Sequence, residues 1–179
     1  TKETNPLGGE TTYTYDAVGR PASRTDPKHQ TFTYAYDELD RLTEIHQPDA
    51  SVTRYNYDCC VLAGVSDANG TNTFQYDALK RLIASADPFN KTIQYVYDAN
   101  RNVTNLIYPG GNVVRYEYDS RNRMNKVTDW FGNTTAYSYD NAGRLTASLN
   151  SNGTATHYQY DAINRLITLV NARTDGSII

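Results

Sequence analysis

The sequence has few of the residues from which catalytic and metal sites are usually built. Among 179 residues there are three histidines, two cysteines and one methionine. His29, His46 and His157 fall at different positions of a repeat described below, so we do not expect them to meet at a metal or beside a nucleophile. No spacing of Ser, His and Asp, or of Cys and His, is typical of nucleophilic catalysis. The sequence therefore predicts a protein that is not an enzyme, with no catalytic residues, no metal site and no cofactor.

Long apolar runs and an excess of one charge are also missing. No apolar run approaches the roughly 18 residues of a membrane-spanning helix, so we predict no membrane insertion by this segment. The net charge is −3, which gives no reason to expect nucleic acid as a partner. With 39% hydrophobic residues, the chain is nevertheless too apolar to be disordered.

The two cysteines, Cys59 and Cys60, are neighbours in the sequence. An ordinary disulfide places its two Cα atoms further apart than one peptide link allows. Two interpretations stay open, free thiols or a local vicinal pair, and neither determines the redox compartment.

What the sequence does contain is a repeat rich in tyrosine. The pattern Tyr-x-Tyr-Asp occurs seven times, an eighth copy begins with Phe74, and 15 of the 16 tyrosines occupy its two aromatic columns. Successive repeat aspartates are 21 residues apart in six intervals and 19 residues apart in one. A period this regular is typical of a repeat architecture. We predict one repeat array over residues 1–179, with units that begin near Asp16, Asp37, Asp58, Asp77, Asp98, Asp119, Asp140 and Asp161.

Two turn patterns divide each unit into two strands. The repeat Asp suits the first corner of a type I turn, where its carboxylate caps the backbone. Gly, Asn or Asp stands three residues later in five copies, where a positive φ gives a bulged hairpin. Arg stands four residues after Asp in six copies, and we interpret the pair as a structural ion pair rather than an acid–base dyad. A second turn pattern follows each Asp by about ten residues, which leaves about six residues for each strand.

The strand that enters each Asp turn alternates between apolar and polar residues. Phe32, Tyr34 and Tyr36 share one face, and Thr33 and Ala35 share the other. This period of two predicts antiparallel strands with one face covered, the aromatic one. The Leu, Ile or Val of the returning strand is expected to fill the space between tyrosines of successive units. The predicted fold class is all-β: about eight β-hairpins in a continuous antiparallel, curled or spiralling β-strip of roughly sixteen strands.

The residues assigned to the structural repeat are the two aromatic columns and the turn Asp, Arg and Gly positions. They are Tyr13, Tyr15, Asp16, Arg20, Tyr34, Tyr36, Asp37, Arg41, Tyr55, Tyr57, Asp58, Phe74, Tyr76, Asp77, Arg81, Tyr95, Tyr97, Asp98, Tyr116, Tyr118, Asp119, Arg123, Tyr137, Tyr139, Asp140, Gly143, Arg144, Tyr158, Tyr160, Asp161 and Arg165. A last turn is expected at Thr174-Asp175-Gly176. Unpaired strand edges at the two ends of the array predict edge-to-edge self-association of the isolated chain.

The unit is seen most purely as Tyr137-Ser-Tyr139-Asp140-Asn-Ala-Gly143-Arg144-Leu145-Thr146, which resembles the YD repeat of the Rhs family. That family includes bacterial Rhs toxins, the B and C components of insecticidal toxin complexes, wall-associated proteins and teneurins. The resemblance covers essentially the whole chain. It implies a β-strip that spirals into a hollow shell and, in bacteria, encloses a toxic C-terminal domain. The expected partners are the remaining repeats of a longer parent protein and this cargo, in a secreted or cell-surface setting.

Two units depart from the pattern. The unit between Asp58 and Tyr76 is two residues short and has Leu62 where Arg is expected. A later unit has Arg101 one place early and Asn102 in the Arg column. Local bulges and a change in the curvature of the strip are both compatible with these departures.

A second function remains open beside the structural one. The YD repeats of the resembled family have been described as carbohydrate-binding, so the aromatic residues are candidates for a glycan or partner site. The tyrosine columns alternate strictly with polar residues, which favours a role in the covered face. The better candidates for a ligand or for contact with another strip are the aromatics at turn tips, Phe89, Tyr108, Trp130 and Phe131.

Overall fold

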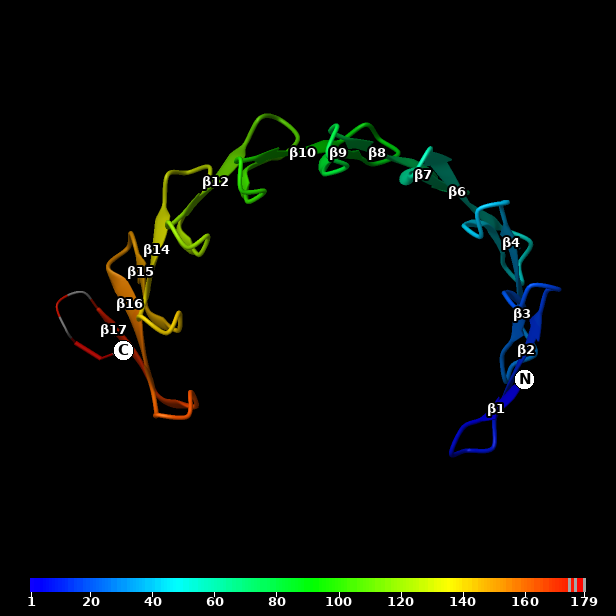
Figure 1. Cartoon of the computed structure of the whole chain (residues 1–179), viewed down its shortest axis with the longest axis horizontal. Helices are drawn as coiled ribbons and strands as arrows, with labels where there is room; N and C mark the ends of the chain where they lie inside the picture. Colours follow the sequence, from blue (N-terminus) through cyan, green and yellow to red (C-terminus); the bar gives the residue numbers. More distant parts are fainter. Residues whose placement is uncertain (174, 176, 179) are drawn as a thin grey trace. The chain divides into compact units, whose positions relative to one another are not determined.

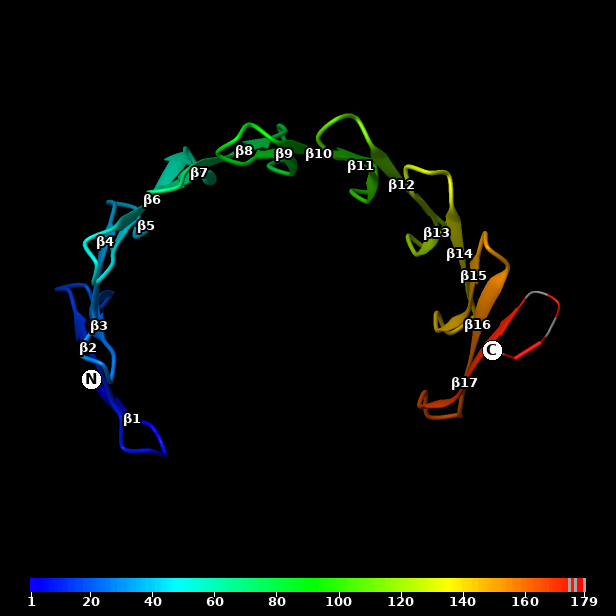
Figure 2. The ribbon, with the colours of Figure 1, turned by 180° about the vertical axis from the view of Figure 1, so that it is seen from behind.

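The computed structural model describes residues 1–173, 175, 177 and 178, which form strands and turns. The chain divides into two compact units, Thr1–Thr92 and Ile93–Ile179. The predicted all-β hairpin array is confirmed in both, with seventeen strands in the described residues and antiparallel pairing between successive strands. Within each unit the strands follow one another side by side along a curved ribbon (Figure 1), which Figure 2 shows from behind.

The strand bounds follow the repeat. The first unit contains β1 (Lys2–Thr4), β2 (Glu10–Tyr15), β3 (Pro21–Thr25), β4 (Thr31–Tyr36), β5 (Leu42–His46), β6 (Val52–Asp58), β7 (Val61–Asp67), β8 (Gly70–Tyr76) and β9 (Leu82–Ala86). The second unit contains β10 (Thr92–Tyr97, whose first residue belongs to the first unit), β11 (Val103–Ile107), β12 (Val113–Tyr118), β13 (Met124–Thr128), β14 (Thr134–Tyr139), β15 (Leu145–Asn150), β16 (Thr154–Tyr160) and β17 (Leu166–Arg173).

Each hairpin that closes on an Asp turn has a bulge at its second aromatic column. Ala35 pairs with Glu44 but Tyr36 pairs with Leu42, so Thr43 is an extra residue in the returning strand. The same register shift recurs in the other seven hairpins of this kind. The bulge explains why the apolar residues of the returning strands are three apart in the sequence, and it places an apolar residue opposite each second-column tyrosine, such as Leu42 opposite Tyr36 and Met124 opposite Tyr118.

Three-residue loops close the regular hairpins, and each needs a left-handed residue at its third position. At the Asp turns this residue is glycine in Gly19 and Gly143, as the sequence predicts. In two other Asp turns the left-handed residue is Lys80, with φ 59°, and Arg101, with φ 72°. Neither residue type is favoured at such a position, so the sequence did not predict these two conformations. The position in the repeat, rather than the residue type, therefore determines the backbone conformation.

The short repeat loses its two residues from its two turns, one from each. Asp58 pairs with Val61 across a two-residue loop, where the regular repeat has a three-residue loop. Asp67 pairs with Gly70 across another two-residue loop. Gly70 has φ 128°, and a Cβ there would lie 2.5 Å from Cβ of Pro88, so the tighter turn requires glycine. The bulge of this repeat is the one seen in the regular repeats, so the two missing residues are taken from the loops.

The aromatic face is half-buried rather than buried, which corrects the expectation of a covered face. Each unit is a single sheet layer, and the buried hydrophobic residues among those described are only Val114, Ala155 and Ala172. The repeat tyrosines are half-buried, except Tyr15, which is 48% exposed. One layer leaves the rings in contact with neighbouring strands but without an opposing sheet.

Two remaining expectations concern membranes and the C-terminus. The described residues include no helix with the length and apolar character needed to cross a membrane. Of the predicted turn at Thr174-Asp175-Gly176, residues Thr174 and Gly176 lie outside the described residues, and the Asp175 carboxylate accepts a hydrogen bond from the Ser177 backbone.

Candidate functional site: the contact between successive repeats

The repeat aspartate caps its own turn. Oδ1 of Asp119 accepts hydrogen bonds from the backbone N–H groups of Arg121 (2.8 Å) and Arg123 (3.0 Å). Its Oδ2 accepts a third from Nε of Arg123 at 2.8 Å. The Arg123 side chain and these backbone donors hold the pKa of Asp119 below its usual value, because they stabilise the carboxylate. The structural interpretation of the Asp–Arg pair thus has a geometric basis, and six such pairs with side chains within 2.7 Å are present.

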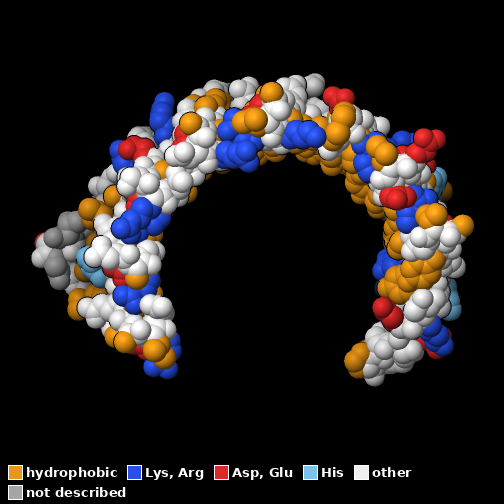
Figure 3. Space-filling model, viewed as in Figure 1, with side chains coloured by type: hydrophobic (Ala, Val, Ile, Leu, Met, Phe, Trp, Pro, Cys, Tyr) orange, Lys and Arg blue, Asp and Glu red, His pale blue; other side chains and the backbone are white. Residues whose placement is uncertain are grey.

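The repeat arginine also reaches the following repeat. Cζ of Arg123 lies 4.5 Å from the ring centre of Tyr139, and Nη1 donates to the carbonyl of Asp140 at 3.3 Å. A guanidinium over an aromatic face is attracted by the ring's negative charge distribution. The same stacking is made by Arg20 on Tyr36, Arg41 on Tyr57 and Arg144 on Tyr160. Lys and Arg side chains, drawn in blue in Figure 3, recur at intervals along each unit.

The second-column tyrosine returns a contact to the preceding repeat. The Tyr118 hydroxyl donates to the carbonyl of Val103 at 2.9 Å. The pairing of β11 with β12 runs only from Asn105 to Ile107, so this carbonyl lies beyond the ladder and accepts from the phenol instead. Equivalent bonds join Tyr36 to Pro21, Tyr57 to Leu42, Tyr76 to Leu62 and Tyr139 to Met124. Burial raises the pKa of Tyr118 above its usual value, because the phenolate is less well solvated there.

We call these two interactions together the inter-repeat clasp: the turn arginine on the next tyrosine ring, and that tyrosine's hydroxyl on the preceding backbone. Asn102 replaces the arginine in one copy, and its Nδ2 still donates to Asp98 Oδ2 and to Asn122 in the next repeat. In the last copy, Arg165 donates from its side chain to Asp161 Oδ2. Its side chain is 73% exposed, whereas that of Arg123 is 25% exposed. Contact with the following repeat is what covers the arginine.

The turn aromatics separate into one cluster and one isolated ring. In the second unit the rings of Tyr108 and Trp130 meet edge to face with centroids 5.4 Å apart, and Trp130 contacts Phe131 at 5.7 Å. We call these three residues the aromatic cluster. Phe131 is 80% exposed and Trp130 is 45% exposed. Phe89 belongs to a turn of the first unit, where it is 77% exposed.

The three histidines lie on different elements, and none belongs to a metal-binding group in the described residues. His29 is in a turn, His46 ends β5 beside Glu44, and His157 lies in β16. No group of three or more His, Cys, Asp and Glu side chains among the described residues has the geometry to hold a metal ion.

Comparison with protein families decides what kind of array this is. The family model described as teneurin YD-shell matches residues 1–130 and, in a second alignment, residues 65–178. The chain belongs to the teneurin YD-shell family. A search of curated proteins returned no match.

Solved structures share the YD-shell fold. The crystal structure of TcdB2-TccC3-Cdc42 aligns with a TM-score of 0.80 at 16% identity, over 99% of this chain and 11% of that chain. The crystal structure of TcdB2-TccC3 gives a TM-score of 0.79 at 17% identity, over 96% and 11%. The Tc holotoxin pore of Photorhabdus luminescens gives 0.75 at 18% identity, over 94% and 12%. The chain thus spans about a tenth of the length of each of these structures.

The clasp is the functional feature of this YD-shell chain that sequence reasoning missed. Arg123 makes the ion pair with its own turn Asp119, and its Nη1 also donates to the carbonyl of Asp140, 17 residues later in the next repeat. One pattern pointed to it: Arg and Tyr keep a fixed separation of 16 residues, from Arg20 to Tyr36 and from Arg123 to Tyr139. A constant separation between two unlike side chains across a turn is what a contact between neighbouring repeats requires.

Proposed function

We propose that this chain is a non-enzymatic wall segment of a YD shell, which encloses a toxic or effector domain and helps to deliver it. Its partners are the remaining repeats of the parent protein and a C-terminal cargo domain, in a secreted or cell-surface bacterial setting. Membership of the YD-shell family and the fold shared with Tc toxin structures support this proposal.

The observation that carries it is the clasp, repeated along the chain. Within the contacts that the structure describes, Arg20, Arg41, Arg123 and Arg144 stack on the tyrosine of the following repeat, and tyrosines such as Tyr118 and Tyr139 donate to a backbone carbonyl of the preceding one. Joints of the same kind, repeated along the chain, let repeats be added one after another, because each repeat contacts only its neighbours. A catalytic site needs the opposite arrangement, in which unlike groups meet once.

Protection of the cargo from protease tests the proposal. In the parent protein, we expect the C-terminal domain to resist added protease, and deletion of one complete repeat, residues 119–139, to make it sensitive. Phe131→Ala is the control, since this exposed side chain lies outside the clasp. Cargo that is digested equally fast in the intact protein and in the deletion variant would contradict an enclosing wall.

The aromatic cluster favours a second candidate function, recognition of a carbohydrate or of a partner surface. Exposed rings of Trp130 and Phe131 provide apolar faces on a turn that the sheet does not require. Trp130 is the sole tryptophan of the chain, so its fluorescence reports directly on this cluster. Titration with a glycan panel should change that fluorescence in the wild type and leave it unchanged in Phe131→Ala, with Phe89→Ala as the matched turn variant. If no glycan changes the fluorescence, carbohydrate recognition is refuted and the wall function is the one that remains.

A further inference from the structure

Two adjacent thiols stand at the tip of the one hairpin whose Asp turn is shortened. Cys59 and Cys60 are the two loop residues between β6 and β7, and both are exposed. Their Sγ atoms lie 2.6 Å apart. Cys59 has φ 50°, a left-handed conformation that presents its side chain beside that of its neighbour at the narrow tip.

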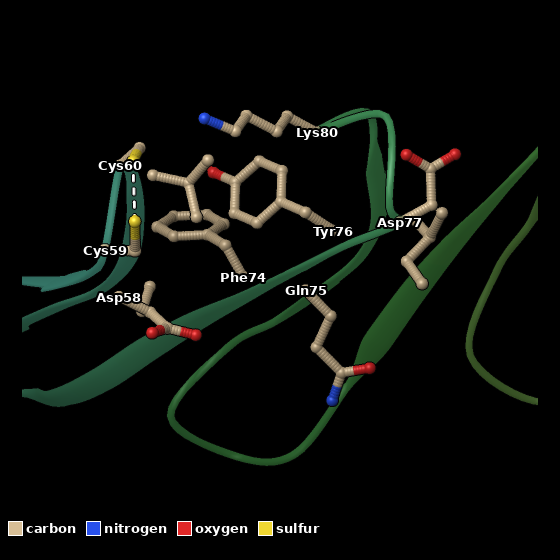
Figure 4. Close-up of a pocket in the computed structure, with 11 residues that line it drawn as sticks. Asp58, Cys59, Cys60, Phe74, Gln75, Tyr76, Asp77 and Lys80 are labelled. Carbon is tan, nitrogen blue, oxygen red and sulfur yellow. Dashed lines mark hydrogen bonds between the residues drawn. The ribbon is translucent and has the colours of Figure 1, made fainter.

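The cysteines border an open pocket of about 510 Å³, together with Tyr76 and Lys80 from the next hairpin. Figure 4 shows the Lys80 side chain extending from its own turn across Tyr76 toward the two sulfurs. Arg41 of the preceding repeat donates from Nη1 to the Cys59 carbonyl, where other repeats offer the carbonyl of the turn Asp. Two cations from the flanking repeats therefore approach this tip, and the acidic groups lining the pocket are Asp58 and Asp77.

The surroundings shift the pKa values of the two thiols in opposite directions. The hydrogen bond from Cys59 and the positive charge of Lys80 lower the pKa of Cys60, and the same hydrogen bond raises the pKa of Cys59. The thiolate, not the thiol, is the nucleophile in sulfur chemistry, and a neighbouring cation favours it. The pair therefore consists of one sulfur suited to attack and one kept protonated beside it.

We propose that Cys59 and Cys60 form a thiol–disulfide exchange site for low-molecular-weight disulfides, with Cys60 attacking, Cys59 resolving and Lys80 stabilising the attacking sulfur. The Cys60 thiolate attacks a disulfide RSSR; a Cys60–SR bond forms, the RS–SR bond breaks and one RS⁻ leaves. Cys59 then loses its proton and attacks the Cys60 sulfur, which releases the second RS⁻. The two cysteines are oxidised to a vicinal disulfide, RSSR is reduced, and the two cysteine protons end on two RSH molecules.

The oxidised form is expected to be easily reduced. Consecutive Cα atoms are about 3.8 Å apart, shorter than the roughly 4.4–6.8 Å of ordinary disulfides, and strained exposed disulfides are the labile ones. Because Arg41 binds the Cys59 carbonyl, the reaction takes place at a joint between two repeats. This site does not depend on the proposed wall function.

Dithiodipyridine tests the proposal, since it is a neutral disulfide that Lys80 and Arg41 do not attract by charge. At pH 7 the folded chain should release two thiopyridones, carry no label by mass spectrometry and react about tenfold faster than the same chain unfolded in urea. Two retained labels, or a folded rate no higher than the unfolded rate, would overturn the proposal. Dithiothreitol should restore both free thiols.

Single substitutions test the roles of the residues. Cys59→Ser should react at nearly the wild-type initial rate and keep one label, whereas Cys60→Ser should react about tenfold more slowly. Lys80→Gln should slow the first step about threefold, and Lys28→Gln, at another exposed turn, should not change it. Equal rates for Cys59→Ser and Cys60→Ser refute the assignment of Cys60 as the attacking thiolate. Far-UV circular dichroism identifies any variant that fails to fold, and the alanine variant is then measured in its place.

Discussion

Removal of one phenolic hydroxyl measures the clasp without disturbing the packing of the sheet. Tyr118→Phe keeps the ring and removes the donor that bonds the Val103 carbonyl at 2.9 Å. A neutral hydrogen bond contributes about 1 kcal/mol net, and an acceptor left without its donor in a half-buried site raises that cost toward about 1.5 kcal/mol. We expect Tyr118→Phe to lower the free energy of unfolding by about 1 kcal/mol.

The same strand supplies the matched control. Tyr116 lies two residues earlier on the same face of β12, and in the described structure its hydroxyl makes no hydrogen bond. Tyr116→Phe should therefore change the free energy of unfolding by less than about 0.5 kcal/mol. Urea unfolding of the two variants, followed by circular dichroism, should show a lower midpoint only for Tyr118→Phe, with the slope unchanged.

The double variant Tyr118→Phe/Tyr139→Phe extends the test along the array. The two hydroxyls bond different carbonyls, those of Val103 and Met124. Independent bonds would add to a loss of about 2 kcal/mol. Because Met124 accepts from Tyr139 and also pairs with Tyr118 in the sheet, a departure from this sum measures the coupling between the two joints. If Tyr118→Phe is as harmless as Tyr116→Phe, the tyrosine hydroxyl contributes nothing to the joint with the preceding repeat, where Asn102 stands in place of the arginine.

Three further predictions concern acid, turn geometry and the array's end. Hydrogen bonds from the Arg41 backbone to Asp37 and from the Arg123 side chain to Asp119 keep the pKa values of both carboxyls below 3.8. The stabilisation of the folded chain by these two carboxylates is therefore complete above that pH and is lost as pH falls through the lowered values. Equal urea midpoints at about pH 6 and about pH 2.5 would contradict this. Gly70→Ala should destabilise the chain more than Gly19→Ala in the same unfolding assay. An added Cβ at Gly70 would lie 2.5 Å from Pro88, whereas a Cβ at Gly19 would meet open space. At both positions the positive φ alone costs about 1 kcal/mol. Sedimentation velocity should show concentration-dependent association of the isolated chain that Leu169→Lys weakens, since Leu169 in β17 is 52% exposed; a strict monomer at high concentration argues against edge association.

The repeat period and turn chemistry were enough to predict most of the fold. Asp and Gly at fixed offsets identify the hairpin turns, and alternation in Thr31–Tyr36 identifies the aromatic face. These features are local, so a single sequence contains them. The left-handed conformation of Lys80 and Arg101 could not be predicted, because tertiary pairing on both sides of the loop overrides their preference.

The burial of the tyrosines and the contacts between repeats could not be predicted from the sequence for a different reason. Strict alternation predicts that the tyrosines share a face, but it does not say how much covers that face. The half-buried rings result from a single layer, a property of the whole array rather than of Tyr116 or its neighbours. The short repeat shows the same limit. Its length in the sequence predicts that two residues are missing, but not that one is lost from the turn at Asp58 and one from the turn at Asp67.

Arg165 and Arg123 together show where the stability of such an array lies. Both arginines bind their own turn Asp, with contacts of 2.6 Å, yet only Arg123 is stacked on a tyrosine of a following repeat. The Arg123 side chain is 25% exposed and the Arg165 side chain is 73% exposed, and this difference is the burial that a following repeat provides. With no opposing layer to bury the rings, coupling between adjacent repeats takes over part of the role that a core has in a globular domain. Each clasp then couples two repeats. Loss of the Tyr118 hydroxyl should weaken the joint with the preceding repeat, loss of the Arg123 guanidinium the joint with the following one, and loss of both should weaken the two joints of this repeat together.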